Sequence, residues 1–182
     1  MVAFSVNIGG KMKLYEISDS YLDYLKSFDD RVLNRLGEKY RHTRKYLGIL
    51  LKINDCDYIA PLSSPSQTDY LNGVIRKSII PIVRIVKSKS GEITLLGKIK
   101  LSSMVPVYDK SVIKKYDINH EIDTKYKNLV FDQLNFINSN KKLIIKYANT
   151  LYRQKIKNFS IGYVNRTVNF LLLEEKAKLY NK

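Results

Sequence analysis

Two adjacent serines, Ser63 and Ser64, stand where an apolar stretch of the chain ends and a polar segment opens with Pro65. A second group of hydroxyl-bearing and cationic side chains lies upstream: Tyr40, Arg41, His42, Thr43, Arg44 and Lys45. An apolar run, Tyr46–Ile53, separates the two groups, and if it pairs as a hairpin with Asp57–Leu62 the groups meet at one end of that hairpin. Converging hydroxyls and cations suit chemistry on a phosphodiester, because they bind phosphoryl oxygens and neutralise their charge.

The chain is strongly basic. Its 182 residues include 32 Lys and Arg against 17 Asp and Glu, which gives a formal net charge of +15 at pH 7. An excess of this size predicts a polyanionic partner, with nucleic acid favoured over an anionic membrane face. The alternative is a basic surface that only keeps the protein soluble.

Four cations are candidates for contacts along an RNA chain: Arg41, Lys45, Arg76 and Lys77. They also fit an ordinary solvated face, so both interpretations stay open. The 14 tyrosines and six phenylalanines can stack unpaired bases between such cations. Most of the tyrosines, however, occupy apolar-periodic positions that are typical of packing residues. The aromatic content therefore supports a single-stranded RNA partner only weakly.

Composition also sets limits. The single cysteine, Cys56, excludes a disulfide within the chain and a zinc site built from several cysteines. No apolar segment reaches the roughly 20 residues that a spanning helix needs. Residues 1–11 lack the pattern of a signal peptide and are predicted to be a disordered lead or a remnant ahead of Met12. We expect one domain over residues 1–182, located in the cytoplasm.

Strand patterns dominate the first part of the chain and helical patterns the second. Apolar runs between turn signals predict strands at Lys13–Ile17, Tyr46–Ile53, Asp57–Leu62, Ile79–Val86, Ile93–Leu101 and Met104–Tyr108. Helical spacing predicts a helix from Ser18 or Ser20 to Phe28, and others at Tyr126–Asn138, Lys141–Lys157 and Val168–Leu179. The segment Ser63–Lys77 is predicted to be a long polar loop. This order of elements indicates an α+β fold with an antiparallel sheet.

Several enzyme classes lack their motifs in this chain. No phosphate-binding loop, dinucleotide fingerprint or nucleophile elbow is present. Only two histidines occur, His42 and His120, and both are predicted to face solvent in loops. The adjacent carboxylates Asp29-Asp30 and Glu174-Glu175 are predicted to end a helix and to lie on an exposed helical face, so neither pair indicates a two-metal nuclease.

Chemistry without a metal or cofactor remains possible on RNA. RNA carries its own nucleophile, the 2′-hydroxyl beside each phosphate. A protein then needs only to align this hydroxyl with the 5′-oxygen, help the proton transfers and stabilise charge on the phosphoryl oxygens. The residues Tyr40, Arg44, Ser63 and Ser64 have the side chains for these tasks.

The chain resembles the endoribonuclease toxins of type III toxin–antitoxin systems, the ToxN and AbiQ family, and is most similar to the AbiQ members. The resemblance rests on blocks that recur in order over nearly the whole chain after Met12. They are Lys13-Leu14-Tyr15-Glu16-Ile17-Ser18, Phe28-Asp29-Asp30, Tyr46-Leu47-Gly48-Ile49, Tyr58-Ile59-Ala60-Pro61-Leu62-Ser63-Ser64-Pro65, Met104-Val105-Pro106-Val107, Gln133-Leu134-Asn135-Phe136-Ile137 and Asn169-Phe170-Leu171-Leu172-Leu173-Glu174-Glu175-Lys176.

The resemblance implies catalytic roles for four residues. The Pro-Leu-Ser-Ser-Pro block implies that Ser64 is the active-site serine and that Ser63 is the hydroxyl residue before it. The family's tyrosine and the basic residue four positions later fall on Tyr40 and Arg44, where a lysine is familiar in place of arginine. Ser66 is a second departure, because some relatives carry lysine after Ser-Pro. Without the resemblance, serines ahead of a proline are typical of a turn closed by local hydrogen bonds.

The resemblance also implies a fold and a partner. The implied fold is a strongly twisted antiparallel sheet of the MazF and Kid type, surrounded by helices. The implied activity is RNA cleavage that leaves a 2′,3′-cyclic phosphate and a 5′-hydroxyl, with a repeated, pseudoknotted antitoxin RNA as inhibitor and a role in phage defence. Two alternatives stay open from the residues alone: a noncatalytic RNA-binding protein, and a DNA-binding regulator with a recognition helix near Lys141–Lys157.

Overall fold

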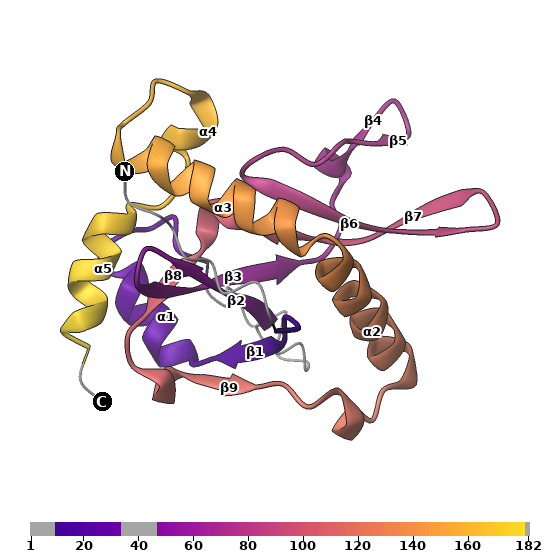
Figure 1. The fold of residues 1–182 in the computed structure, drawn as a ribbon, viewed down its shortest axis with the longest axis horizontal. Helices are drawn as coiled ribbons and strands as arrows, with labels where there is room; N and C mark the ends of the chain where they lie inside the picture. The colour runs from indigo at the N-terminus through magenta and orange to yellow at the C-terminus, as the bar shows by residue number, and fades with distance from the viewer. Residues whose placement is uncertain (1–9, 34–46, 181–182) are drawn as a thin grey trace.

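The computed structural model describes residues 10–33 and 47–180 (Figure 1). The expected lead over residues 1–11 lies outside the described residues as far as residue 9. From Gly10 onward the chain is attached to the helical part of the molecule. The Met12 backbone N–H donates to Asn138 Oδ1 at 2.8 Å, and Lys141 Nζ donates to the Gly10 carbonyl.

The described strands form one large sheet and one small ribbon. The large sheet contains β1 Leu14–Ile17, β2 Leu47–Ile53, β3 Cys56–Ser63, β6 Ile82–Lys89, β7 Glu92–Lys100, β8 Val105–Val107 and β9 Ile113–Lys115. Its order is β6-β7-β3-β2-β1-β9, with β8 also paired to β3, and every pairing is antiparallel. The small ribbon pairs β4 Tyr70–Leu71 with β5 Val74–Ile75. The expected α+β class with an antiparallel sheet is confirmed, and the likeness to MazF and Kid stays a prediction.

Strands β2 and β3 form the predicted hairpin at the centre of the sheet. Their register runs from Ile53↔Cys56 at the turn to Gly48↔Pro61. Most residues of both strands are buried, including alternate residues that point to opposite faces of the hairpin. The two-residue turn begins with Asn54 at φ 44°, a conformation that asparagine tolerates better than most residues. The free thiol of Cys56 is buried beside this turn.

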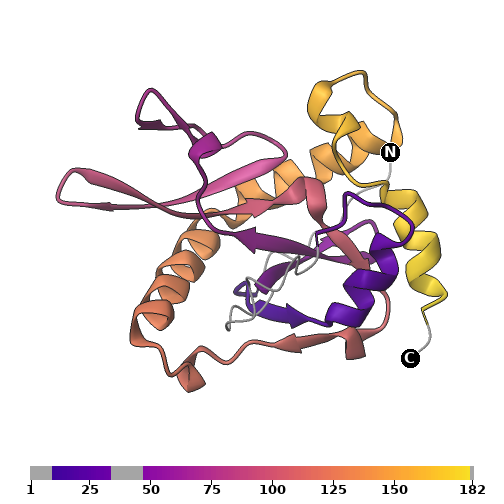
Figure 2. The same ribbon diagram turned by 180° about the vertical axis from the view of Figure 1, so that it is seen from behind.

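Strands β6 and β7 form a second, longer hairpin that projects from the body of the molecule (Figures 1 and 2). Lys89 pairs with Glu92, so the turn contains only Ser90 and Gly91, both at positive φ. Two central residues at positive φ define the turn type whose twist matches that of an antiparallel hairpin. The strands predicted to end at Val86 and to begin at Ile93 therefore extend further toward the turn than predicted, to Lys89 and from Glu92.

Five helices occur in the described part of the chain: α1 Asp19–Lys26, α2 Thr124–Ser139, α3 Lys141–Ile156, α4 Gly162–Asn165 and α5 Phe170–Lys178. The Asp123 side chain caps α2 by accepting two backbone N–H groups, and Asn169 caps α5. Figure 1 shows α3 lying across the sheet, α2 beside the β6–β7 hairpin, and α1 and α5 together at the opposite end. None of these helices is long and apolar enough to cross a membrane.

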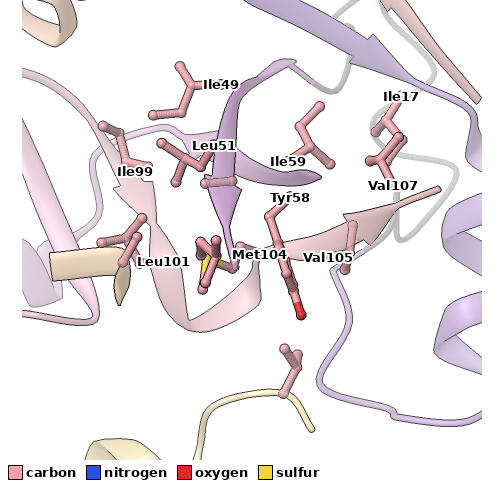
Figure 3. Close-up of a cluster of buried hydrophobic side chains, with 14 of the residues drawn as sticks. Ile17, Ile49, Leu51, Tyr58, Ile59, Ile99, Leu101, Met104, Val105 and Val107 are labelled. Carbon is pink, nitrogen blue, oxygen red and sulfur yellow. The ribbon is translucent and has the colours of Figure 1, made fainter. Parts of the chain in front are cut away.

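The hydrophobic core lies between the sheet and the helices. Figure 3 shows side chains of several strands meeting there, among them Ile49, Ile59, Ile99 and Val105. Each is at most 1% exposed. Full burial of one such side chain stabilises the fold by about 1.5–3 kcal/mol. This core holds β3 and β7 in place, and the polar residues described below follow from that placement.

Several local predictions are corrected. The segment 63–77 is not a simple loop: it contains a 3₁₀ turn at Gln67–Asp69 and the β4–β5 ribbon, which turns at Asn72-Gly73. Strand β9 and helix α4 were not predicted, because three- and four-residue elements carry too little periodicity to be seen.

Two expectations about helices are also corrected. The first helix, predicted to reach Phe28, ends at Lys26, and Phe28 beyond it is 40% exposed. Glu174 is not on an exposed face, because it accepts hydrogen bonds from the buried hydroxyls of Tyr58 at 2.5 Å and Tyr152 at 2.9 Å. Only its neighbour Glu175 is exposed as expected.

Candidate functional site

Strand β3 delivers the two serines to the end of the central hairpin. Ser63 is its last residue and is half-buried, whereas Ser64 is exposed. The first part of β3 pairs with β2 and β8, and its end pairs with β7 through Leu62↔Ile99 and Ser63↔Lys98. The described part of β2 begins beside this end of β3. The serines therefore leave the sheet at a position that two neighbouring strands determine.

A row of polar residues crosses three strands at this position. Ser63 stands opposite Lys98, and Lys98 stands opposite Arg84. Directly opposed residues of antiparallel strands point to the same face of the sheet. The flanking residues Ile99 and Val83 point to the other face and are fully buried in the core. Strand alternation alone therefore separates the core face from a face that carries a serine and two cations.

Asp69 lies over this row and binds both cations. Its Oδ2 accepts a hydrogen bond from Lys98 Nζ at 2.5 Å, and its Oδ1 accepts one from Arg84 Nε at 3.1 Å. Ser66 donates to Oδ2 from its backbone N–H at 2.9 Å and from its hydroxyl at 3.0 Å. All three charged side chains are nearly inaccessible, at 1% exposed for Asp69, 5% for Arg84 and 6% for Lys98. We call Asp69, Arg84 and Lys98 the buried charge cluster.

The buried charge cluster carries more positive than negative charge. Burial by itself raises the pKa of Asp69, but hydrogen bonds from Lys98 and Ser66 outweigh this effect and hold the pKa below its usual value. One carboxylate therefore faces two cations. Two residues further along β7, Lys100 has a lowered pKa because of its burial and the nearby charge of Lys98. An anion bound beside Ser63 would balance this local excess of positive charge.

Gly97 allows the sheet to close tightly behind Ser63. A Cβ atom on Gly97 would lie 2.9 Å from the Ser63 carbonyl oxygen and 2.8 Å from Gln133 Nε2. The φ angle of Gly97 is 148°, in a region that is essentially restricted to glycine. The Gln133 side chain itself donates to the Leu96 carbonyl at 2.8 Å, so helix α2 is attached to β7 at this point.

Four of the eight predicted site residues lie in the described part of the chain. Ser63 and Ser64 begin the segment that Asp69 anchors, and Arg76 and Lys77 end it with exposed side chains. The Arg76 backbone N–H donates to the Asp69 carbonyl at 2.8 Å, and the Lys77 carbonyl accepts from Arg84 Nη1 at 2.8 Å. The other four residues lie outside the described residues, so their approach to the serines stays a prediction: Tyr40, Arg41, Arg44 and Lys45.

Sequence reasoning missed the buried charge cluster. A signal was present, because Arg84 and Lys98 each interrupt an apolar strand pattern. A charged residue in such a place usually requires a buried partner. Asp69 could not be identified as that partner, since it lies 15 and 29 positions away in the chain.

Metal ligands are not clustered in the described part of the molecule, where no three His, Cys, Asp or Glu side chains gather in a geometry that could hold an ion. The predicted exposure of His120 is confirmed: its side chain is 87% exposed and interacts with Asp117. His42 lies outside the described residues. The expectation of a metal-independent reaction stays a prediction.

Comparison with known proteins gives consistent matches over this whole fold. A family model described as toxin ToxN of type III toxin–antitoxin systems matches residues 13–178. An endoribonuclease ToxN of Pectobacterium atrosepticum is 33% identical over 171 residues, covering 94% of this chain and 95% of that protein. An endoribonuclease AbiQ of Lactococcus lactis is 25% identical, covering 94% and 90%. The chain is thus more similar in sequence to this ToxN than to this AbiQ, whereas the resemblance pointed to the AbiQ members.

Solved structures match equally far along the chain. One, from work on a processed non-coding RNA that regulates a bacterial antiviral system, has a TM-score of 0.77 and 30% identity, covering 94% of this chain and 100% of that chain. Another, from work on selective toxin inhibition by a non-coding RNA pseudoknot, has a TM-score of 0.73 and 26% identity, covering 94% and 98%. With a family model spanning most of the chain and a relative above 30% identity, the chain belongs to the ToxN family of type III toxin–antitoxin toxins.

Proposed function

We propose that this protein is an endoribonuclease toxin of a type III toxin–antitoxin system that acts in defence against phage. The observation that carries the proposal is the serine pair at the end of β3, placed opposite a buried cluster with surplus positive charge, in a chain of the ToxN family. A phosphodiester is the ligand class that such a site suits, because its anionic oxygens complement both the hydroxyls and the cations.

The proposed reaction is an internal transfer within the RNA. The 2′-oxygen forms a bond to the adjacent phosphorus, and the bond from phosphorus to the 5′-oxygen breaks. The proton lost by the 2′-hydroxyl is balanced by the proton gained by the leaving 5′-oxygen. The products are a 2′,3′-cyclic phosphate and a 5′-hydroxyl, so no water, oxidant or cofactor is consumed.

The residues have distinct proposed roles in this reaction. Ser64, which is exposed, holds the scissile phosphate, and the half-buried Ser63 orients the backbone beside it. Arg44 stabilises the phosphoryl oxygens as a fixed cation, since its very high pKa makes proton transfer by this side chain unfavourable. Tyr40 donates its hydroxyl to the phosphate or stacks on a base.

The proposed partner is a repeated, pseudoknotted antitoxin RNA, which the toxin trims from a precursor and which then inhibits it. Support comes from the relatives, whose solved structures concern a processed non-coding RNA and inhibition by an RNA pseudoknot. The cations Arg41, Lys45, Arg76 and Lys77 are proposed to contact the RNA backbone. The cytoplasm, where cellular and phage transcripts lie, is the proposed location.

The test is incubation of purified protein with RNA in the presence of EDTA. We expect cleavage products that end in a 2′,3′-cyclic phosphate, which are identified by mass spectrometry. Ser64→Ala should lose most of this cleavage and keep much of the RNA affinity, because other phosphate contacts remain. Intact RNA under conditions where the protein binds it would favour a noncatalytic RNA-binding role. Tighter binding to duplex DNA than to single-stranded RNA at matched salt would favour a DNA-binding regulator.

A further inference from the structure

The segment that follows the serines is attached to the sheet at both of its ends. Ser66, two residues after Ser64, binds Asp69 through both its backbone N–H and its hydroxyl, and the hydroxyl also accepts from Lys98 Nζ at 2.8 Å. These bonds form a capping box at the start of the 3₁₀ turn. The position of the chain just after Ser64 therefore depends on the carboxylate of Asp69.

The other end of the segment is attached through two residues of the same cluster, Asp69 and Arg84, partly by their backbone groups. The Asp69 carbonyl accepts from the Arg76 N–H at 2.8 Å, and Arg84 Nη1 donates to the Lys77 carbonyl at 2.8 Å. The Arg84 backbone N–H donates to Ser78 Oγ, also at 2.8 Å. Asp69 and Arg84 thus hold both ends of a segment that carries the serines at its start.

Stability alone does not account for this arrangement. Three charges removed from water pay a desolvation cost that their mutual attraction only partly repays, and apolar residues of similar volume often stabilise a fold as well or better. Charged hydrogen bonds have a second property that apolar contacts lack: they fix direction and distance. The cluster also lies against the serine end of β3, because Lys98 stands directly opposite Ser63.

We propose that Asp69 is a positioning residue for RNA cleavage, which together with Lys98 and Arg84 holds Ser63 and Ser64 in the geometry that the reaction requires. This proposal rests on the proposed function of the serines. A displacement of about 1 Å at a reacting centre can lower a rate by about 100-fold. Weakening the cluster should therefore lower the rate of the chemical step more than it lowers RNA affinity.

Three variants test the proposal. Asp69→Asn keeps the shape of the side chain and removes its charge. Ser66→Ala is the gentler variant, since Ser66 is exposed and loses only its three hydroxyl contacts, to Asp69, Lys98 and Thr68. Asp132→Asn is the control, because it breaks the 2.6 Å ion pair between Lys87 of the β6–β7 hairpin and Asp132 of α2 without touching the serine segment.

The measurements are the single-turnover cleavage rate, the affinity for an RNA with a 2′-deoxy substitution at the cleavage site, and hydrogen exchange of residues 64–77. We expect the rate to fall by about 100-fold in Asp69→Asn and about 10-fold in Ser66→Ala. Affinity should change less than about three-fold in both, and exchange should accelerate in residues 64–77. Asp132→Asn should match the wild type in rate and in exchange of this segment.

Specific results would overturn the proposal. A wild-type cleavage rate in Ser66→Ala and Asp69→Asn, with faster exchange in residues 64–77, would show that the position of the segment does not matter. An equal loss of rate in Asp132→Asn would assign the effect to general destabilisation. If Asp69→Asn does not fold, Ser66→Ala decides. Full activity of Ser64→Ala would instead overturn the proposed catalytic site. That result differs from wild-type cleavage rates in Asp69→Asn and Ser66→Ala, which would overturn only the proposed role of Asp69.

Discussion

Gly97→Ala is expected to damage both folding and cleavage, because the added methyl group is directed at the Ser63 carbonyl. The new Cβ would stand 2.9 Å from that oxygen and 2.8 Å from Gln133 Nε2. Ordinary contacts begin near 3.4 Å, so the end of β3 must move by about 0.5 Å, and the Gln133 amide must also shift and give up its bond to the Leu96 carbonyl. The φ angle of 148° adds strain for any residue with a side chain.

The magnitude follows from these contributions. Backbone strain of this kind costs about 1–3 kcal/mol. Loss of the Gln133 hydrogen bond costs about 1 kcal/mol more. A total of about 2–4 kcal/mol lowers the Tm of a domain of this size by about 4–16 °C. Moving Ser63 by about half an ångström should lower the single-turnover cleavage rate by about 10-fold, in proportion to the loss seen for larger displacements.

Gly91→Ala is the matched control on the same hairpin. Gly91 also has a positive φ, of 84°, but nothing lies within 4 Å of its added Cβ. This variant should lose only the strain contribution, about 1–2 kcal/mol, and cleave RNA at the wild-type rate. Thermal denaturation and single-turnover cleavage of both variants are the assays. A Gly97→Ala protein with wild-type Tm and rate would refute the inferred close packing behind Ser63.

Three further predictions concern charge. Lys100→Met should raise the Tm by a few degrees, because burial and Lys98 disfavour the charged amine. Calorimetry measures this effect, and a lower Tm would contradict it. The pKa of Asp69 is lower in the folded protein than in the unfolded chain. The stability that this carboxylate supplies is therefore present above about pH 4 and is lost as the pH falls through the folded pKa. The Tm measured from about pH 6 to about pH 2 should fall less steeply in Asp69→Asn than in the wild type, and parallel curves would count against the cluster. Arg76→Ala and Lys77→Ala should each weaken binding to single-stranded RNA without changing the Tm. In each variant the slope of log binding constant against log salt concentration should fall by about 1 in magnitude, and an unchanged slope would mean that these cations form an ordinary solvated face.

Local patterns in the chain were sufficient to predict its main elements. The apolar runs on either side of Asn54 predicted the central hairpin, since a short polar turn between two such runs leaves the antiparallel ribbon as the favourable pairing. Helical spacing predicted α2 from Val130, Leu134 and Ile137, and α3 from Ile144, Ala148 and Leu151; all six pack in the core, Leu134 only partly buried. Charge and family blocks led to RNA as the partner class, and those blocks carried the serine assignment.

Contacts between distant parts of the chain were needed for everything that surrounds the serines. No short-range pattern pairs Asp69 with Lys98, or Glu174 with Tyr58, because such partners are selected by how strands and helices pack rather than by spacing along the chain. The burial of these charged and hydroxyl groups made partners obligatory, and folding of the sheet determined which ones were within reach. A serine pair that looks like a turn in the sequence thus becomes, in the folded molecule, the end of a strand held over surplus positive charge.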